Sequence, residues 1–232
     1  MANRINIKKY LLPCNNEDLP DNLIAAAIWL DDGKEPVHAG IFIRYHGENK
    51  FFHYPGYDKV ELEEDDSFDI DGWYFHKKLT VVDEALLPSI LTHCEIVVKE
   101  AKPEYGYYYM GEMYDESGDF ISHLKAPQFM TCVGICLNFL KYCLRGKDFV
   151  EYEDWDISSV ELSRGEEFVE YFIKKIKTKF PHVDIDKFKK GIRRIWPIEY
   201  LTAAFDKTIP VKKEFTDEHS SKVNLQLKKL VA

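Results

Sequence analysis

The stretch VHAGIFIRYHGENKFFHYPG, residues 37–56, decides the fold. Two runs rich in aliphatic and aromatic residues flank the polar segment His46-Gly47-Glu48-Asn49-Lys50, which contains one glycine. This pattern is typical of a β-hairpin whose loop spans those five residues. His38 lies on the first strand and His53 on the second. Because antiparallel strands bring residues on either side of a turn together, the sequence predicts neighbouring imidazoles, with the register left to the loop.

More strands surround this hairpin. On its N-terminal side, NLIAAAIWLD at 22–31 is apolar and ends at the turn DDGKEP, so we expect a buried strand. On its C-terminal side, KVELEE at 59–64 and WYFHKKLTVV at 73–82 have strand character, with acidic turns between them. The first half of the chain is therefore predicted to be an antiparallel meander.

A helix and a long loop should follow. Residues 83–103 carry apolar side chains at helical spacing, with Pro88 in the first turns and Pro103 closing the segment. The next segment, 105–128, is rich in tyrosine and has no clear period. It predicts a long loop, and loops of this length in compact domains are often functional.

The segment FMTCVGICLNFLKYCLRG, residues 129–146, predicts a second, buried helix. Thr131 is a suitable N-cap and Gly146 a suitable stop. Cys132 is then the first residue of this helix, whereas Cys136 and Cys143 are expected to be small core residues.

The final third of the chain has a different character. An acidic patch at 151–156 precedes an amphipathic helix near 165–180. Residues 174–194 contain nine Lys or Arg against two Asp, which we interpret as a solvated helix face. An apolar run at 193–205 should pack back on the core, and the charged tail from Lys212 is expected to be mobile. We therefore predict a core at 1–146 and a helical extension at 147–232.

Composition limits the function classes. Hydrophobic residues make up 45% and charged residues 31%, as in an ordinary globular protein. A net charge of −9 and a pI near 5.4 argue against nucleic acid as the main partner, because such binding relies on Lys and Arg. The chain has neither a signal-peptide pattern nor a stretch of about 18 uncharged apolar residues, so a cytoplasmic protein without a transmembrane segment is expected.

The sequence predicts no metal site and no cofactor. The five cysteines, an odd number without disulfide-framework spacing, should be reduced thiols. Cys132 and Cys136 stand four residues apart on one helix, but no further pair completes a four-ligand zinc set. The acidic clusters at 61–71 and 151–156 lack calcium-loop spacing, so we expect them to be solvated edges.

The residues that could carry chemistry are a thiol and two imidazoles. A helix N-terminus and a nearby imidazolium both favour the thiolate of Cys132. His38 would be the base, and His53 would fix its tautomer. An oxyanion hole would use the backbone N–H of Cys132 and a second donor, for which the sequence offers Gln128 or a tyrosine such as Tyr107 or Tyr109, without deciding between them. The tyrosines could equally line a substrate groove or pack the loop.

These segments resemble a known superfamily. HAGIFI followed by FFHY is similar to the histidine hairpin of the NlpC-type papain-like proteins, and TCVGICLNFL is similar to their helix-opening cysteine motif. Here the cysteine helix follows the histidines, as in the circularly permuted branch that includes YiiX-like, lecithin:retinol acyltransferase-like and PPPDE proteins. The resemblance covers about residues 22–146. It implies that Cys132 is the nucleophile, His38 the base and His53 the third polar residue. The chain lacks the Asn-Cys-Glu-His-Phe run of the retinol acyltransferases.

The sequence thus predicts an α+β protein with a permuted papain-like fold. The function expected from it is a cysteine hydrolase of the peptidase, amidase or acyl-transfer type, acting on an amide, isopeptide or (thio)ester carbonyl of a peptide, protein or acyl-amide substrate. The alternative is an inactive papain-like scaffold that binds or regulates through the Tyr-rich loop or the basic helix. A third hypothesis is a binder of nucleic acid or an acidic partner through residues 174–194.

Overall fold

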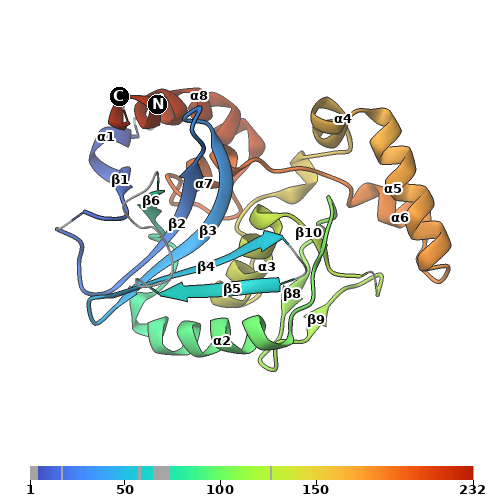
Figure 1. Cartoon of the computed structure of the whole chain (residues 1–232), viewed down its shortest axis with the longest axis horizontal. Helices are drawn as coiled ribbons and strands as arrows, with labels where there is room; N and C mark the ends of the chain where they lie inside the picture. Colours follow the sequence, from blue (N-terminus) through green and yellow to red (C-terminus); the bar gives the residue numbers. More distant parts are fainter. Residues whose placement is uncertain (1–4, 17, 57–58, 65–73, 126, 232) are drawn as a thin grey trace.

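The largest element of the computed structural model is a six-stranded antiparallel sheet in the order β1-β6-β2-β3-β4-β5 (Figure 1). The structure describes residues 5–16, 18–56, 59–64, 74–125 and 127–231. The strands are β1 (Leu12–Pro13), β2 (Leu23–Leu30), β3 (Pro36–Tyr45), β4 (Glu48–Gly56), β5 (Lys59–Glu64) and β6 (Tyr74–Lys78). Together with several helices, the antiparallel sheet confirms the predicted α+β class. The acidic turns expected at 65–67 and 69–72 lie outside the described residues.

The hairpin of β3 and β4 turns more tightly than the sequence suggested. His46 and Gly47 alone form the turn, with φ of 52° and 86°, and Tyr45 pairs directly with Glu48. Two consecutive residues with positive φ define the type I′ turn, whose twist matches that of a two-stranded ribbon. Glu48, Asn49 and Lys50, expected in the loop, therefore belong to β4. This turn sets the register that pairs Gly40 with His53.

The central strands of the sheet are apolar on both faces. Its inner face carries Ile24, Ala26 and Ile28 of β2 and joins the main core. Its outer face carries Ala25 and Ala27 of the same strand, which pack into a smaller cluster with other buried side chains, Cys14, Leu19, Leu23, Phe42 and Phe51. Because both faces of β2 are covered, this strand reads as a continuous apolar run rather than as an alternating one. The predicted buried strand at 22–31 is confirmed.

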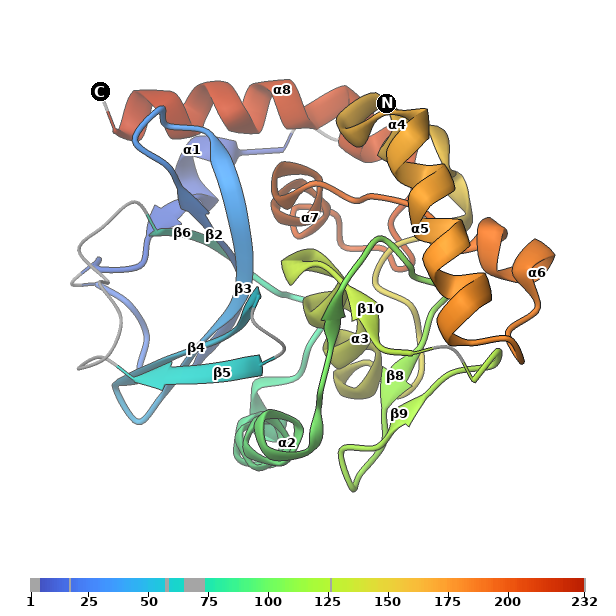
Figure 2. The same ribbon diagram turned by 45° about the vertical axis from the view of Figure 1, so that its right-hand side comes forward.

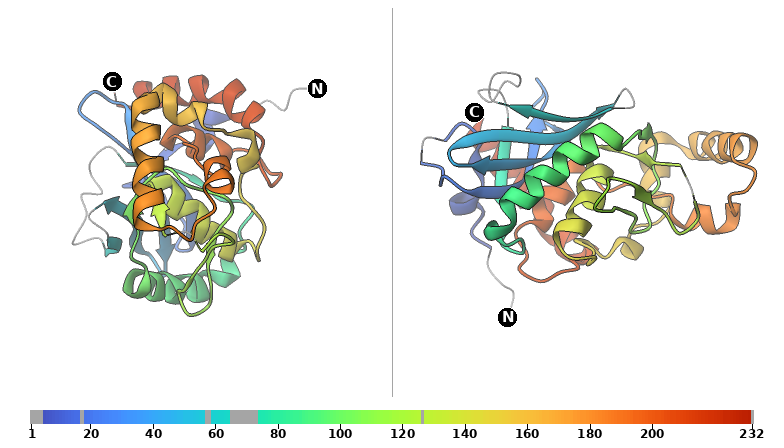
Figure 3. Two further views of the ribbon diagram at one scale, coloured as in Figure 1. Left: turned by 90° about the vertical axis from the view of Figure 1, so that its right-hand side faces the viewer. Right: turned by 90° about the horizontal axis from the view of Figure 1, so that it is seen from below.

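Three helices cover the inner face of the sheet (Figures 2 and 3). They are α2 (Leu87–Glu100) after a short 3₁₀ turn η1 (Glu84–Leu86), α3 (Cys132–Cys143) and α7 (Pro197–Ala203). α3 contacts β3 and β4, α2 contacts β5, and α7 contacts β2 and β3. The helices predicted after residue 83 and after Thr131 are both confirmed, with Pro88 in the first turn of α2.

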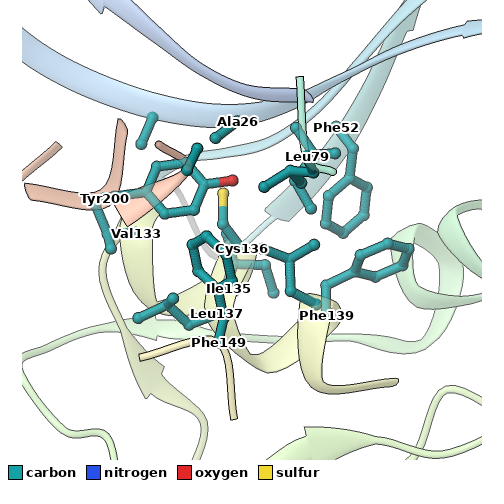
Figure 4. Close-up of a cluster of buried hydrophobic side chains, with 14 of the residues drawn as sticks. Ala26, Phe52, Leu79, Val133, Ile135, Cys136, Leu137, Phe139, Phe149 and Tyr200 are labelled. Carbon is teal, nitrogen blue, oxygen red and sulfur yellow. The ribbon is translucent and has the colours of Figure 1, made fainter. Parts of the chain in front are cut away.

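α3, α7 and the sheet meet in an apolar cluster that contains a buried polar contact (Figure 4). The hydroxyl of Tyr200 on α7 donates a hydrogen bond to the carbonyl oxygen of Gly40 at 3.3 Å. The sulfur of Cys136 lies beside the same hydroxyl, among Ala26, Phe52 and other apolar side chains. Cys136 and Cys143 are buried, as predicted for core residues. The hydrogen bond fixes α7 to the strand that carries His38.

The segment expected to be one long loop contains short strands. β7 (Glu104–Tyr105) pairs in parallel with β10 (Phe129–Met130), and β8 (Met113–Tyr114) pairs antiparallel with β9 (Phe120–Ile121). Two-residue strands give too short a repeat for a periodic signal in the sequence. The β7–β10 pair connects the end of α2 to the start of α3.

Three helices at the far side of the molecule form a second apolar cluster (Figure 2). They are α4 (Ser158–Arg164), preceded by η2 (Tyr152–Asp154), α5 (Glu166–Lys179) and α6 (Ile185–Lys190). The cluster includes Tyr107, Tyr108 and Phe129, together with Phe172 and Phe188 from the helices. The predicted amphipathic helix near 165–180 is confirmed as α5.

One expectation for the last third is wrong. The tail from Lys212 forms α8 (Lys213–Leu230), which buries Thr216, His219, Val223 and Leu227 and packs along α7 and α1 (Ile7–Tyr10). Its apolar positions are sparse among charged residues, which hid the helix. The basic stretch at 174–194 is largely the solvated face that was predicted, because most of its lysines are exposed. Arg193 is the exception: it is only 6% exposed, and its guanidinium lies over the ring of Tyr152.

A buried histidine on the outer face makes stability depend on pH. His76 of β6 is 2% exposed, with its ring 5.3 Å from that of Phe42. Burial, with a smaller effect of the Lys77 charge, lowers the pKa of His76 from 6.5 to about 4. The folded state therefore binds fewer protons than the unfolded state. Its contribution to stability is complete above pH 6.5 and is lost as the pH falls towards 4.

We predict that His76→Leu flattens this dependence. In wild type, His76 alone should reduce the free energy of unfolding by about 2 kcal/mol between pH 8 and pH 5. The measurement is urea denaturation across that range. Replacement of the exposed His182 by Asn is the matched control and should leave the slope unchanged. An unaltered slope in His76→Leu would contradict the assignment.

Candidate active site

Cys132 opens α3, and the sequence before it explains why the helix begins there. Thr131 has an extended backbone, and its Oγ1 accepts a hydrogen bond from the N–H of Gly134 at 3.2 Å. This is an N-cap, which satisfies one of the free N–H groups of the first turn. Cys132 is therefore held at the positive end of the helix, where it is partly buried against the main core.

The thiol of Cys132 meets the sheet at the residue after His38. Hydrogen bonds from the backbone N–H groups of Ala39 and Val133 reach the sulfur. Ala39 lies just beyond the last β3–β4 pair, which joins Gly40 to His53. The structure thus brings Cys132 to the open end of the histidine hairpin.

Opposing effects act on the pKa of Cys132. Burial raises it, whereas the N–H groups of Ala39 and Val133 and the positive charge of Arg194 lower it, and burial is the largest effect. The sequence predicted a thiolate. The structure instead favours a neutral thiol in the resting protein, so a base must accept its proton when it reacts.

Arg194 was not singled out by the sequence as part of this site. Its guanidinium stacks on the ring of Trp196 at 3.6 Å and lies 5.4 Å from that of Tyr107. These rings hold a positive charge near Cys132. Arg194 belongs to a stretch of basic residues in which neighbours such as Lys189 and Lys190 are exposed. The sequence pattern therefore did not distinguish Arg194 from a surface residue.

The two histidines form a direct pair. His38 Nε2 lies 2.7 Å from His53 Nδ1, and the rings meet nearly edge to face at 81°. His53 is opposite Gly40, so His38 is its diagonal neighbour on the same face, where Phe51 packs beside both rings. That face is the outer one, whereas α3 packs on the inner one. The imidazole and the thiol therefore approach the same end of β3 from its two sides.

Both imidazoles are neutral at physiological pH. Burial, followed by the charge of His53, lowers the pKa of His38 from 6.5 to about 3. Burial lowers the pKa of His53 to about 4. One imidazole must donate in the shared hydrogen bond and the other must accept, so the tautomer of either ring determines that of the other.

A carboxylate extends this pair. His53 Nε2 lies 3.4 Å from Oε2 of Glu63 on β5. Burial, followed by repulsion from the neighbouring Glu61, raises the pKa of Glu63. We expected the cluster at 61–71 to be a solvated edge. Of its three described acidic residues, Glu64 is exposed, whereas Glu61 and Glu63 are only partly exposed, and residues 65–71 lie outside the described residues. Glu61 and Glu63 are two residues apart on β5, so they lie on the same face of the sheet. Glu61 is the residue that pairs with His53, and the pairing of β4 with β5 becomes irregular just after His53.

The candidate oxyanion residues have other contacts. Gln128 accepts hydrogen bonds at Oε1 from the N–H of Lys102 at 3.2 Å and the hydroxyl of Tyr114 at 3.3 Å. The hydroxyl of Tyr107 accepts from Nε of Arg164 at 2.8 Å and pairs with the hydroxyl of Tyr105.

Tyr107 and Tyr109 lie beside the first turn of α3. Tyr109 is 4% exposed and packs edge to face against Tyr152. With Thr131 and Gly134, the two tyrosines line a void of about 10 Å³, enough for one water molecule. The two tyrosines therefore pack around the first turn of α3 and do not line an open groove.

Comparison with known proteins does not extend these observations. No family model, curated protein or solved structure matches the chain. Among the described residues, no helix has both the length and the apolar character needed to cross a membrane. The functional argument therefore rests on the geometry of Cys132, His38 and His53.

Proposed function

We propose that the protein is a cysteine hydrolase with a circularly permuted papain-like fold, in which Cys132 is the nucleophile. The observation that carries the proposal is the 2.7 Å contact between His38 Nε2 and His53 Nδ1, at the end of the strand where Ala39 donates to the Cys132 thiol. A nucleophile at a helix N-terminus, a base on an adjacent strand and a third group that orients the base are the parts that thiol catalysis needs. The histidine hairpin precedes the cysteine helix, as in the permuted branch of this superfamily.

The hydrogen bonds suggest a direction for proton movement. If His38 Nε2 donates to His53 Nδ1, the proton of His53 is on Nε2 and faces the carboxylate of Glu63 at 3.4 Å. In this arrangement, His38 Nδ1 carries no proton and can accept one. Glu63 and His53 are then positioning residues, and His38 is the catalytic base.

The proposed reaction is acyl transfer. The Cys132 sulfur forms a bond to the carbonyl carbon of an amide, isopeptide or (thio)ester, while its proton passes to His38. The backbone N–H of Cys132 would donate to the oxyanion. The bond to the leaving group breaks as His38 returns the proton to the leaving nitrogen, oxygen or sulfur. Water then hydrolyses the thioester, which releases the acid and restores the thiol.

A second candidate function is supported by the burial of the site. The raised pKa of Cys132 and the lowered pKa values of His38 and His53 are also compatible with an inactive scaffold that binds a partner. The two functions differ in whether an acyl-enzyme forms, so that step is the one to measure.

We predict that p-nitrophenyl acetate acetylates Cys132 with a burst of p-nitrophenolate. Peptide mass spectrometry would locate the acetyl group. His38→Ala should slow the burst by about 100-fold or more, because general-base assistance is lost. His53→Ala should slow it less, and His53→Asn should partly restore the rate by supplying an oxygen acceptor to His38. His182→Ala, at an exposed position far from the hairpin in the sequence, is the matched control.

Two results would contradict the hydrolase. One is acetylation of Cys132 at an equal rate in wild type and His38→Ala. The other is the absence of any acetyl group on Cys132 in wild type, which would favour the scaffold.

We also predict that Arg194→Met raises the pKa of Cys132 by about half a unit to one unit, because a nearby positive charge is removed. The pH dependence of iodoacetamide alkylation, followed at the Cys132 peptide, gives this pKa. Lys190→Met removes an exposed charge from the same basic stretch and should leave the profile unchanged. Equal profiles for the two variants would remove Arg194 from the site.

A further inference from the structure

The outer face of the sheet has a cluster of potential metal ligands beside the histidine pair. His53, Glu61 and Glu63 each offer one ligand atom, and these atoms all lie within 4.8 Å of one another. His53 comes from β4 and both glutamates from β5, opposite it in the sheet. The ligand set is thus held on two paired strands rather than on a loop.

His53 is the part of the cluster that points to a ligand. It is 6% exposed, and within the described part of the chain its Nε2 makes no hydrogen bond. A buried ring nitrogen without a hydrogen-bond partner is costly. This nitrogen is directed at Glu63, at 3.4 Å, which is longer than an ordinary hydrogen bond.

That spacing suits a metal ion. Two ligands that each lie about 2.0–2.1 Å from a tetrahedral zinc ion are about 3.4 Å apart. The side chains of Glu61 and Glu63 are 29% and 24% exposed, so they can rotate to close the set and leave a fourth position open to solvent. Glu61 is paired with Lys59 at 3.1 Å, but the lysine side chain is 67% exposed and can withdraw.

Charge also favours a cation at this place. Glu61 and Glu63 place two carboxylate oxygens within 4.8 Å of each other. A divalent ion would neutralise both and would accept the lone pair of His53 Nε2. A neutral imidazole with two carboxylates suits zinc and similar transition-metal ions better than it suits calcium, which prefers an all-oxygen set.

We propose that His53, Glu61 and Glu63 form a binding site for a divalent transition-metal ion such as Zn²⁺, and that the bound ion switches off the base His38. This second part rests on the proposed hydrolase function. A metal on His53 Nε2 requires the proton of that ring to be on Nδ1, which then donates to His38 Nε2. Such a donated N–H is the usual support of a metal-bound histidine. His38 must then carry its own proton on Nδ1 and can no longer accept one from Cys132.

Binding is tested first, without any assay of activity. Zn²⁺ is titrated into the full-length protein in competition with a chromophoric chelator, for wild type, Glu61→Gln, Glu63→Gln and Cys132→Ala. Glu64→Gln is the control, because Glu64 also lies on β5 but pairs with Lys50. We expect one bound ion in wild type, Glu64→Gln and Cys132→Ala, and affinity at least 10-fold weaker in Glu61→Gln and Glu63→Gln. Loss of binding in Cys132→Ala, or equal binding in all variants, would overturn the site.

The switch is tested as the ratio of acetylation rates at Cys132 with and without saturating Zn²⁺. We expect at least a 10-fold decrease in wild type, and a ratio near one in Glu61→Gln at the same Zn²⁺ concentration. Equal inhibition in Glu61→Gln would overturn the switch, because the ion would then act at the thiol. If no acyl-enzyme forms in any variant, the hydrolase fails, while the titration still decides whether the metal site exists.

Discussion

The candidate site depends on the register between β3 and β4. The type I′ turn at His46 and Gly47 fixes that register, and it places His53 opposite Gly40 with His38 as its diagonal neighbour. A slip of one residue would move one imidazole to the other face of the sheet. The same register ends the β3–β4 ladder at Gly40, which leaves the N–H of Ala39 for the sulfur of Cys132. A two-residue turn thus determines which groups can meet at the other end of the hairpin.

Burial determines the protonation states of those groups. Apolar residues cover both faces of the central strands, and the aromatic ring of Phe51 packs beside both histidines. Desolvation disfavours every charged form, so the thiol of Cys132 has a raised pKa and the imidazoles have lowered ones. A thiolate–imidazolium pair is therefore not the resting state. If the site is catalytic, substrate binding must coincide with proton transfer from Cys132 to His38.

Local patterns in the sequence were sufficient for most strands of the large sheet, for α2, α3 and α5, and for part of the site. Alternation and the Gly-containing turn indicated the hairpin, and the N-cap Thr131 placed Cys132 at the start of its helix. Neighbouring imidazoles of His38 and His53 were predicted from the hairpin, with the register left to the loop. The class of fold followed from the succession of strands and helices.

The remaining features depend on contacts between segments distant in the chain. Glu63 reaches His53 through the irregular β4–β5 pairing, and Arg194 reaches the Cys132 region through the packing of the last third on the core. Neither contact leaves a periodic signal. α8 was missed for a related reason, because a helix that buries only one narrow stripe has a mostly charged sequence. The protonation states of Cys132, His38 and His53 could not be predicted from composition, because they depend on how deeply each group is buried in the folded protein.

The hydrogen bond between His38 and His53 couples the protonation of the two imidazoles as well as their positions. Because His38 and His53 share one hydrogen bond, a change in what His53 Nε2 binds must change which nitrogen of His38 carries a proton. A carboxylate at Nε2 would leave His38 able to act as a base, and a metal ion at the same nitrogen would leave His38 without a free nitrogen to accept a proton. Hydrolase and metal site would then be alternative states of one hydrogen-bonded unit. Metal binding at His53, on the outer face of the sheet, would then determine whether Cys132, at the start of the helix on the inner face, can react.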